Sequence, residues 1–375
     1  VFNDFGDKFI VNDEDGEIYE NLFIKEISQD KKIIDFKDKH NLCDRDTLIV
    51  TTNTETVEVK VKNTKTPVSI VLEKEFNYEK TSIKSIIKKK IPVEINFSML
   101  KENINSITPV ISDFSVDFER PHDLHELMLA YNIFIKVNKY VPQTWNDSDF
   151  KVFCSYINNF EAKSETFKKL AQKFCYTFRG TVLPFVSIIA GVVGHEVIKA
   201  LAHKYNPIKQ WYYLDYLELI TNEDLKEDNT SLETKYEGLT NVFGHKLVKK
   251  IQETTPFIVG SGAIGCELLK NLGMMGVQTM FISDPDHIEK SNLSRQFLFS
   301  DEDIHKSKAL VASEKIKLFN PDTNVIICEN KVCEITENIF NKDFHKNIDI
   351  YLNALDNIDA RIYMDKQAIK YSKPL

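Results

Sequence analysis

The sequence predicts an α/β protein whose main domain is a doubly wound parallel sheet, with a small β-rich domain and a helical bundle inserted ahead of it. Three observations support this fold class. After residue 231, short apolar runs alternate with helical patterns, as they do in parallel sheets. A GxGxxG motif lies between one of these runs and a helical pattern. Ahead of them, the first 100 residues favour strands, whereas residues 121–178 repeat with the period of a helix.

Composition limits the classes of function that the chain can serve. Its 375 residues are enough for two or three domains, and 42% hydrophobic with 28% charged residues is an ordinary globular balance. A net charge of −8 argues against a general nucleic-acid surface. Six cysteines occur without a CxxC pair or a secretory segment, so we expect reduced thiols in a cytoplasmic or nuclear protein. The chain starts without methionine and stops abruptly, and we expect it to be a fragment.

The first two predicted domains are a β-rich domain in residues 1–100 and a helical bundle in residues 101–178. Ile10–Glu20 carries an Asp-Gly turn between apolar runs, which is typical of a hairpin. Val57–Lys62 alternates with period two, so one of its faces is buried. In the second domain, apolar residues recur every three or four positions from Pro121 onward.

The third predicted domain, residues 179–230, opens with the most apolar run of the chain, TVLPFVSIIAGVVG (Thr181–Gly194). This run is shorter than the ~20 apolar residues that a membrane span needs, and its small residues predict a tightly packed, buried helix. We therefore expect no membrane association. Gln210–Leu219 is expected to be a strand, and the polar loop Thr221–Thr234 marks the boundary to the last domain, residues 231–375.

Strands and helices are expected to alternate through the last domain, as in a Rossmann-like fold. The expected strands are Phe257–Gly260, Thr279–Ser283, Asn324–Glu329 and Asp349–Leu355. The expected helices are Ala263–Met275, Lys306–Phe319 and Asp359–Tyr371.

The glycine motif consists of Gly260, Gly262 and Gly265, between the first of these strands and the first helix. Residues without side chains let the backbone approach phosphates, which then lie at the positive N-terminus of the helix. Asp284 follows about 20 residues later at the end of the second strand, where a carboxylate can accept hydrogen bonds from ribose hydroxyls. These features alone fit a nicotinamide-dependent dehydrogenase as well as an ATP enzyme. Glycines that serve only a tight turn are the simpler alternative.

Three polar side chains past the second strand favour ATP. Asn292, Arg295 and Lys308 supply an amide, a guanidinium and an ammonium group. Such groups suit a triphosphate that carries more charge than one helix terminus can balance, whereas a dehydrogenase has no need of them there. Taken singly, Arg295 or Lys308 would be an ordinary surface cation. Behind the glycine motif and Asp284, the cluster predicts a nucleotide site.

Asp356 closes the fourth strand, in the segment NALDNIDAR. Carboxylates at the carboxyl ends of parallel strands face the ligand crevice. Beside a triphosphate, Asp356 is a candidate ligand for Mg²⁺ through one hard oxygen atom. The alternative is that Asp356 caps the helix that follows, and both roles are compatible.

Several motifs together resemble the ubiquitin-activating enzyme family. VGSGAIGCELLKNL, DPDHIEKSNLSRQFLF and NALDNIDARIYMD are similar to the active adenylation domain of that family. GTVLPFVSIIAGVVGHEVIKAL and NPIKQWYYLDYLE resemble the end of its inactive adenylation half, and FNDFGDKFIVNDEDGEIYENL resembles its first catalytic-cysteine half-domain. Residues 101–178 match the four-helix insertion of the family in position. The resemblance covers nearly the whole chain, and it implies that the sheet belongs to an adenylation domain.

The resemblance also implies cofactors, site residues and a reaction. The cofactors would be ATP and Mg²⁺, with Asp356 holding the metal ion, and Arg295 and Lys308 would act in catalysis by screening negative charge. The reaction would join the C-terminal glycine of ubiquitin to ATP as an acyl-adenylate, with release of pyrophosphate. A catalytic cysteine outside this chain would then take the acyl group as a thioester, because none of the six cysteines here is a good candidate. Beside the three glycines, the implied ATP contacts are Ala263, Asp284, Asn292, Arg295, Lys308, Asp356 and Asn357.

The expected partners are ubiquitin and ubiquitin-conjugating enzymes, with no nucleic acid and no membrane. The full-length protein would be a monomer with an internal pseudo-dimer of adenylation halves, in cytoplasm and nucleus. Three departures from the family pattern bear on substrate choice: a short loop after Gly276, and Ser300 and Lys235 in place of arginines. The alternatives are a non-catalytic scaffold, an activating enzyme for another ubiquitin-like modifier and, with less support, a nicotinamide-dependent oxidoreductase.

Overall fold

A computed structural model describes the chain except for residues 12–21, 41, 90–91, 106, 111–116 and 222–233. Most of the predicted hairpin at Ile10–Glu20 and of the predicted loop at Thr221–Thr234 lies outside the described residues. The chain divides into two compact units. One comprises Val1–Asp113 with Val192–Tyr212, and the other Phe114–Gly191 with Tyr213–Leu375.

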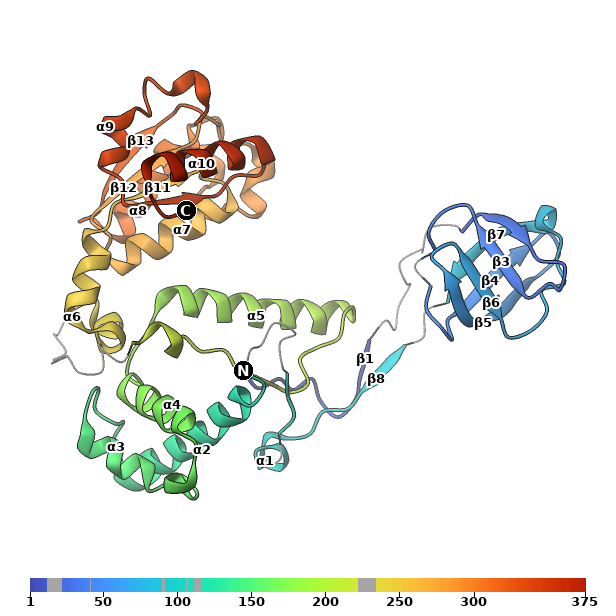
Figure 1. The fold of residues 1–375 in the computed structure, drawn as a ribbon, viewed down its shortest axis with the longest axis horizontal. Coiled ribbons are helices and arrows are strands. Elements are labelled where there is room, and N and C mark those ends of the chain that lie inside the picture. The colour runs from blue at the N-terminus through green and yellow to red at the C-terminus, as the bar shows by residue number, and fades with distance from the viewer. Residues whose placement is uncertain (12–21, 41, 90–91, 106, 111–116, 222–233) are drawn as a thin grey trace. The chain divides into compact units, whose positions relative to one another are not determined.

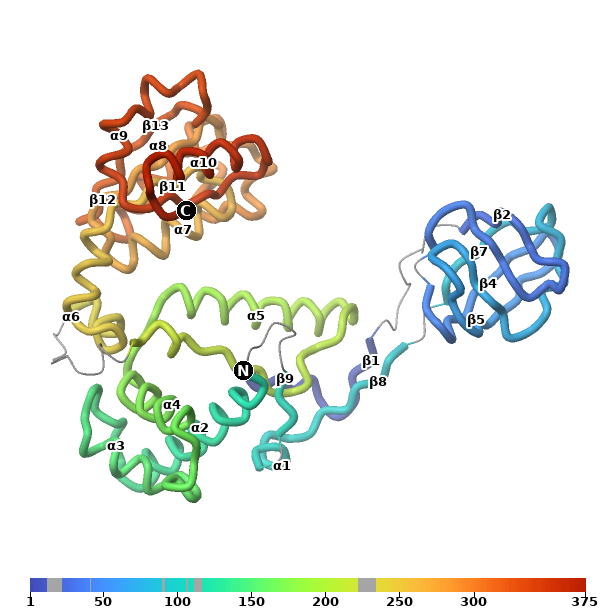
Figure 2. Tube along the Cα trace, viewed as in Figure 1, coloured from blue at the N-terminus to red at the C-terminus, as the bar shows by residue number. Residues whose placement is uncertain are grey.

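The first unit is built on an antiparallel sheet with the strand order β2-β3-β6-β5-β4-β7, which curls into a small barrel-like body (Figures 1 and 2). Its core consists of residues such as Ile34, Leu48 and Ile70, which have no exposed surface. The strand predicted at Val57–Lys62 lies within β5 and is confirmed. The strands are β2 (Ile24–Ile27), β3 (Ile33–Phe36), β4 (Thr47–Thr52), β5 (Thr56–Thr66), β6 (Ser69–Leu72) and β7 (Ile83–Lys88), and a 3-10 turn, η1, spans Lys80–Ser82.

Short elements complete this unit. Strand β1 (Phe9–Val11) pairs antiparallel with β8 (Val93–Ile95), and β9 (Pro109–Val110) pairs parallel with β10 (Trp211–Tyr212); helix α1 spans Leu100–Asn103. The strand predicted over Gln210–Leu219 is therefore wrong beyond Tyr212, and Leu217–Leu219 forms a 3-10 turn, η3. The apolar side chains of that segment indicate burial, which a turn can provide as well as a strand.

The helical part of the second unit confirms the predicted bundle. Its helices are α2 (Arg120–Asn138), α3 (Asp147–Cys154) and α4 (Glu165–Tyr176), with a 3-10 turn, η2, at Phe160–Ala162. Two caps begin them: Asn146 accepts a hydrogen bond from the amide of Asp149, and Ser164 accepts one from the amide of Phe167. The side chains that meet between the helices, and that have no exposed surface, are Leu127, Phe134, Phe153 and Ala171.

Helix α5 (Leu183–Ala202) forms where the apolar run predicted a helix, but it is not the buried helix that we expected. Among its residues only Glu196 is buried, while Val186, Val197 and Leu201 are exposed. Apolar composition predicts that a helix will bury its surface, but it does not identify the packing partner. By length and composition, α5 is the one helix in the described part of the chain that is able to cross a membrane. One such helix is only weak evidence for a membrane span.

The C-terminal part of the second unit is a parallel sheet, as predicted (Figure 1). Its strand order is β13-β12-β11-β14. The predicted elements are confirmed to within two residues at their ends. They are β11 (Pro256–Val259), α7 (Ala263–Met275), β12 (Thr279–Ser283), α8 (Lys308–Phe319), β13 (Asn324–Cys328), β14 (Ile350–Asn353) and α10 (Ile358–Tyr371). Helix α6 (Glu237–Glu253), helix α9 (Lys342–Lys346) and the 3-10 turns η5 (Lys290–Ser294), η6 (Asp301–Asp303) and η7 (Glu334–Thr336) lie around them.

Both faces of this sheet are covered, which makes it doubly wound. On β11, Ile258 packs with Cys266 and Leu269 of α7, while its neighbour Phe257 packs on the opposite face with Met364 of α10. All four residues of β11 are buried, as expected of a central parallel strand. The chain order reverses at β11, because β12 lies on one side of it and β14 on the other. Ligands bind to such sheets at this reversal, outside the carboxyl ends of the strands.

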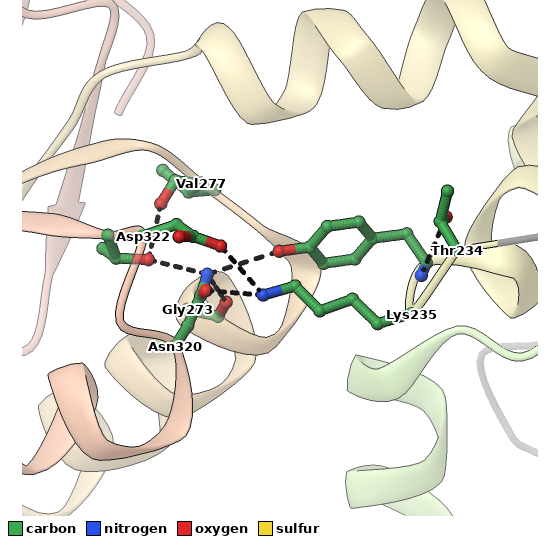
Figure 3. Close-up of polar contacts among 8 residues, drawn as sticks. Thr234, Lys235, Gly273, Val277, Asn320 and Asp322 are labelled. Atoms are coloured by element: carbon green, nitrogen blue, oxygen red, sulfur yellow. Dashed lines mark hydrogen bonds and ion pairs between the residues drawn. The ribbon is translucent and has the colours of Figure 1, made fainter.

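Asn320, at the end of α8, ties three elements of this domain together (Figure 3). Its side chain is 3% exposed and donates to the carbonyl oxygen of Gly273 at 2.9 Å and to Oγ1 of Thr323 at 2.8 Å. Its Oδ1 accepts a hydrogen bond from Nζ of Lys235 at 3.0 Å, and the same ammonium group lies 3.1 Å from Asp322. Lys235, which stands where the resemblance led us to expect arginine, thus holds the entry to α6 against the end of α8.

Candidate functional site

A cavity of about 960 Å³ opens at the carboxyl ends of β11, β12 and β14. It is lined by nine of the ten predicted site residues, which come from segments as far apart in sequence as the glycine turn and the start of α10. These nine residues are Gly260, Gly262, Ala263, Asp284, Asn292, Arg295, Lys308, Asp356 and Asn357. Arg295, Lys308 and Gly262 therefore share one cavity, as the prediction of a single nucleotide site requires.

The glycine turn places the N-terminus of α7 at the floor of the cavity. Gly260 has a φ of +99°, a conformation that favours glycine, and a Cβ atom there would lie 2.6 Å from the carbonyl oxygen of Ala354. Gly265 lies beneath the turn rather than in the cavity wall, because a Cβ atom on it would collide with the carbonyl oxygen of Gly260. The backbone amides at the start of α7 have no intrahelical partners, so an anion can bind there.

Asp284 is buried at the end of β12 and holds the glycine turn in place. Its Oδ2 accepts hydrogen bonds from the amide of Ser261 at 2.6 Å and from the hydroxyl of Ser261 at 2.9 Å. Its Oδ1 accepts one from the amide of Asp286 at 2.9 Å. A carboxylate has about four acceptor positions, so Oδ1 can accept one more hydrogen bond, for example from a ribose hydroxyl.

The two predicted cations of the cavity differ in burial. Lys308 is the first residue of α8 and is 8% exposed, and its Nζ lies 2.9 Å from Oδ2 of Asp286. Arg295 is exposed, and its Nη1 donates to the carbonyl oxygen of Ser291 at 3.0 Å. The Asp286 carboxylate is largely in solvent, so this ion pair is worth little and an incoming phosphate can replace it.

The side chains of Asn292 and Asn357 each accept a hydrogen bond from a backbone amide. Asn292 is buried, and its Oδ1 accepts a hydrogen bond from the amide of Glu289 at 2.9 Å, within a capping box at η5. Asn357 is the N-cap of α10, and its Oδ1 accepts from the amide of Ala360 at 2.8 Å. Their amide nitrogens are the groups that each side chain can offer to a ligand.

Asp356 is exposed in the cavity wall and does not cap the helix. The capping alternative is wrong by one residue, because α10 begins at Ile358 and its cap is Asn357. Among the described residues, no group of three or more His, Cys, Asp or Glu side chains is arranged to hold a metal ion. Proteins commonly bind Mg²⁺ through one or two carboxylates together with substrate phosphates, and Asp356 offers one such carboxylate.

Cys266 lies behind the turn with no exposed surface, and its Sγ is 3.5 Å from the carbonyl oxygen of Ser261. Burial raises the pKa of this thiol to about 11. A thiol with so high a pKa is a poor nucleophile at neutral pH, which confirms Cys266 as a packing residue.

Sequence reasoning missed several residues that line this cavity or lie behind its wall. Ser261 lies inside the glycine motif, and Asp286 follows Asp284 by two positions, yet their roles depend on contacts that spacing does not reveal. Gln296 directly follows Arg295 and was overlooked beside its charged neighbour. Lys331 and Arg361 also line the cavity. Lys331 lies in a segment without a recognisable pattern, whereas Arg361 ends the quoted segment NALDNIDAR and was passed over.

Comparison with known families identifies the fold of this domain. Residues 236–375 match the ThiF family, and residues 91–161 match the ubiquitin-activating enzyme E1 four-helix bundle. The sheet domain is thus an adenylation-type fold of the ThiF class.

Full-length comparisons extend the match to the whole chain. It is 34% identical over 399 residues to "Ubiquitin-activating enzyme E1 1" of Triticum aestivum, which spans 100% of this chain and 38% of that protein. It is 32% identical over 402 residues to "Ubiquitin-like modifier-activating enzyme 1" of Homo sapiens, with 100% and 38% coverage. The chain belongs to the ubiquitin-activating enzyme E1 family and spans about two fifths of the length of these relatives. This membership removes the nicotinamide alternative.

Among solved structures, the tRNA N6-threonylcarbamoyladenosine dehydratase TcdA of E. coli, determined in complex with ATP, is 19% identical. The match covers 38% of this chain and 57% of that chain with a TM-score of 0.35. A similarity of this extent carries no weight in assigning function.

Proposed function

We propose that this chain carries the ATP site of an enzyme that activates ubiquitin by adenylating its C-terminal carboxylate. One observation carries the proposal: the glycine turn, a strand-end carboxylate, two cations and an exposed aspartate converge on a single cavity. A scaffold that only binds partners has no need of this combination. Membership of the ubiquitin-activating enzyme E1 family supports ubiquitin as the substrate.

The reaction requires two anions to approach each other. An oxygen of the ubiquitin carboxylate attacks the α-phosphorus, the new C–O–P linkage forms, and the bond to the β-phosphate breaks as pyrophosphate leaves. Lys308 and Arg295 lower the repulsion between the reactants and stabilise the charge on the leaving group. To do so, Lys308 exchanges its contact with Asp286 for phosphate oxygens.

Two further groups orient the nucleotide. Asp284 would hold the ribose through its free acceptor position, and the turn at Gly262 would hold the phosphates on the amides of α7. Asp356 would hold Mg²⁺, which supplies charge neutralisation and orientation of the phosphates when bound.

The later steps and the setting of the protein are part of the same proposal. A cysteine outside this chain takes the acyl group as a thioester and transfers it to a ubiquitin-conjugating enzyme. The full-length protein acts as a monomer with paired adenylation halves, in the cytoplasm and nucleus, without nucleic acid or membrane partners.

Exchange of labelled pyrophosphate into ATP tests the proposal in the full-length protein that carries this sequence. We expect exchange that depends on Mg²⁺ and on ubiquitin. Exchange only with another ubiquitin-like protein would change the substrate but keep the reaction. ATP binding without exchange in the presence of any such protein would favour the scaffold alternative.

A further inference from the structure

Gln296 occupies a special place in the cavity wall. It follows η5, where its amide donates to the carbonyl oxygen of Asn292 at 2.9 Å and its own carbonyl accepts from the amide of Phe299 at 3.1 Å. These bonds fix its backbone. Its side chain is 4% exposed and lines the same cavity as Gly262 and Lys308.

The carboxamide of Gln296 lies over the glycine turn with one end unpartnered. Its Nε2 is 3.7 Å from the position that a Cβ atom would take on Gly262. Its Oε1 is buried, and no hydrogen-bond donor reaches it among the described residues. More than nine in ten buried polar groups in folded proteins have such a partner, so an acceptor without one at a cavity wall points to a donor supplied by a ligand.

The ligand of the proposed site offers few donors near this position. The triphosphate presents only acceptor oxygens, and the ribose hydroxyls belong at Asp284, at the end of β12. The other reactant differs, because the last residue of a peptide chain carries both a backbone N–H and the terminal carboxylate. A carboxamide is complementary to that pair: one end accepts from the N–H, and the other donates to an anionic oxygen.

We infer that Gln296 is a positioning residue for the peptide substrate. This inference rests on the proposed function. Its Oε1 accepts the last backbone N–H of the ubiquitin tail, and its Nε2 donates to an anionic oxygen above the turn. The carboxylate is thereby held beside the α-phosphate.

Kinetics of pyrophosphate exchange in the full-length protein provide the test. Gln296→Met keeps the length of the side chain but loses both hydrogen-bonding atoms. Since both contacts to the substrate are lost, we expect it to raise the KM for ubiquitin at least about tenfold, and to change the KM for ATP by less than about threefold. The exposed Gln278, in the loop between α7 and β12, provides the control Gln278→Met, which should change neither constant.

A change in the substrate makes the test independent of folding. Ubiquitin in which the last peptide bond is replaced by an ester lacks the N–H but keeps the carboxylate. We expect this substrate to have about a tenfold higher KM with the wild-type protein, and no additional loss with Gln296→Met. Equal losses with both proteins would overturn the inference, as would the absence of any loss with the wild type. A purely structural role would instead raise both KM values or lower the unfolding temperature of the variant.

Failure of this inference is distinct from failure of the proposed function. Were the proposed function wrong, the wild-type protein would show no ubiquitin-dependent exchange. Were only the role of Gln296 wrong, the wild type would exchange normally and Gln296→Met would match Gln278→Met.

Discussion

Ser261 donates two hydrogen bonds to the same oxygen of Asp284, one from its amide and one from its hydroxyl. The carboxylate that sequence reasoning assigned to ribose therefore also fixes the shape of the phosphate-binding turn. We therefore expect binding at the two ends of the nucleotide to be coupled through this one side chain.

Ser261→Ala tests this coupling. The variant loses the hydroxyl bond but keeps the amide bond, so we expect the turn to form and ATP to bind about three- to tenfold more weakly. Asp284→Ala loses both bonds and the ribose contact, and we expect no measurable binding. Titration calorimetry with ATP–Mg²⁺ measures both. Equal losses in the two variants would contradict a separate role for the carboxylate at the ribose.

Asp356→Ala tests the metal site. Because this exposed carboxylate is the candidate Mg²⁺ ligand, we expect the variant to lose the gain in ATP affinity that Mg²⁺ provides, while keeping metal-free binding. Asp301→Ala, on the nearby turn η6, is the matched control and should be nearly silent. Similar effects of the two substitutions would mean that the site is misplaced.

Lys308→Met tests the buried cation. Removal of a charged donor aimed at phosphate oxygens should lower kcat/KM for pyrophosphate exchange about 100-fold or more. Lys306→Met is its control, since that ammonium group lies 3.0 Å from Asp303 and is about half exposed. We expect the control to change the rate by less than about twofold. A small effect of Lys308→Met would contradict a catalytic role for Lys308 and leave it only the ion pair with Asp286.

Asn320→Ala tests the cluster at the end of α8. The substitution leaves the carbonyl oxygen of Gly273 and the Lys235 ammonium group without this partner, and we expect a loss of about 2–3 kcal/mol in the free energy of unfolding. Chemical denaturation measures it. The exposed Asn338, before α9, gives the control Asn338→Ala, which should lie within about 0.5 kcal/mol of the wild type.

Local patterns predicted much of this protein. The strands β11, β12, β13 and β14 and the helices α7, α8 and α10 were predicted because short apolar runs alternate with helical patterns in this part of the sequence. Nine of the ten predicted site residues also meet in one cavity, because the carboxyl ends of neighbouring parallel strands meet at one edge, so Asp284 and Asp356 had to lie near the glycine turn.

Contacts between segments were less accessible. The partners of Ser261 and Lys308 depend on side-chain directions that spacing does not carry. The cap at Asn357 was assigned to its neighbour, because the first residue of a helix depends on backbone angles rather than on composition. The exposure of α5 depends on what surface lies against it, which its own sequence does not describe.

His345 in α9 sets a pH dependence for the stability of the sheet domain. Its side chain is 1% exposed, its Nδ1 lies 2.7 Å from the hydroxyl oxygen of Tyr351, and its ring stacks on Tyr371. Burial lowers the pKa of this imidazole to about 4, from 6.5 in the unfolded chain. Between these values the unfolded state binds more protons than the folded state, so stability rises with pH. The contribution is complete above about pH 6.5 and is lost as the pH falls toward about 4, to a total of at most about 3 kcal/mol.

His345→Gln tests this pH dependence. We expect the unfolding midpoint of the variant to change less with pH across this window than that of the wild type. The control His245→Gln, at an exposed position on α6, should keep the wild-type slope of midpoint against pH. An unchanged slope in His345→Gln would mean that another group, and not the stacked imidazole, controls the acid response of this domain.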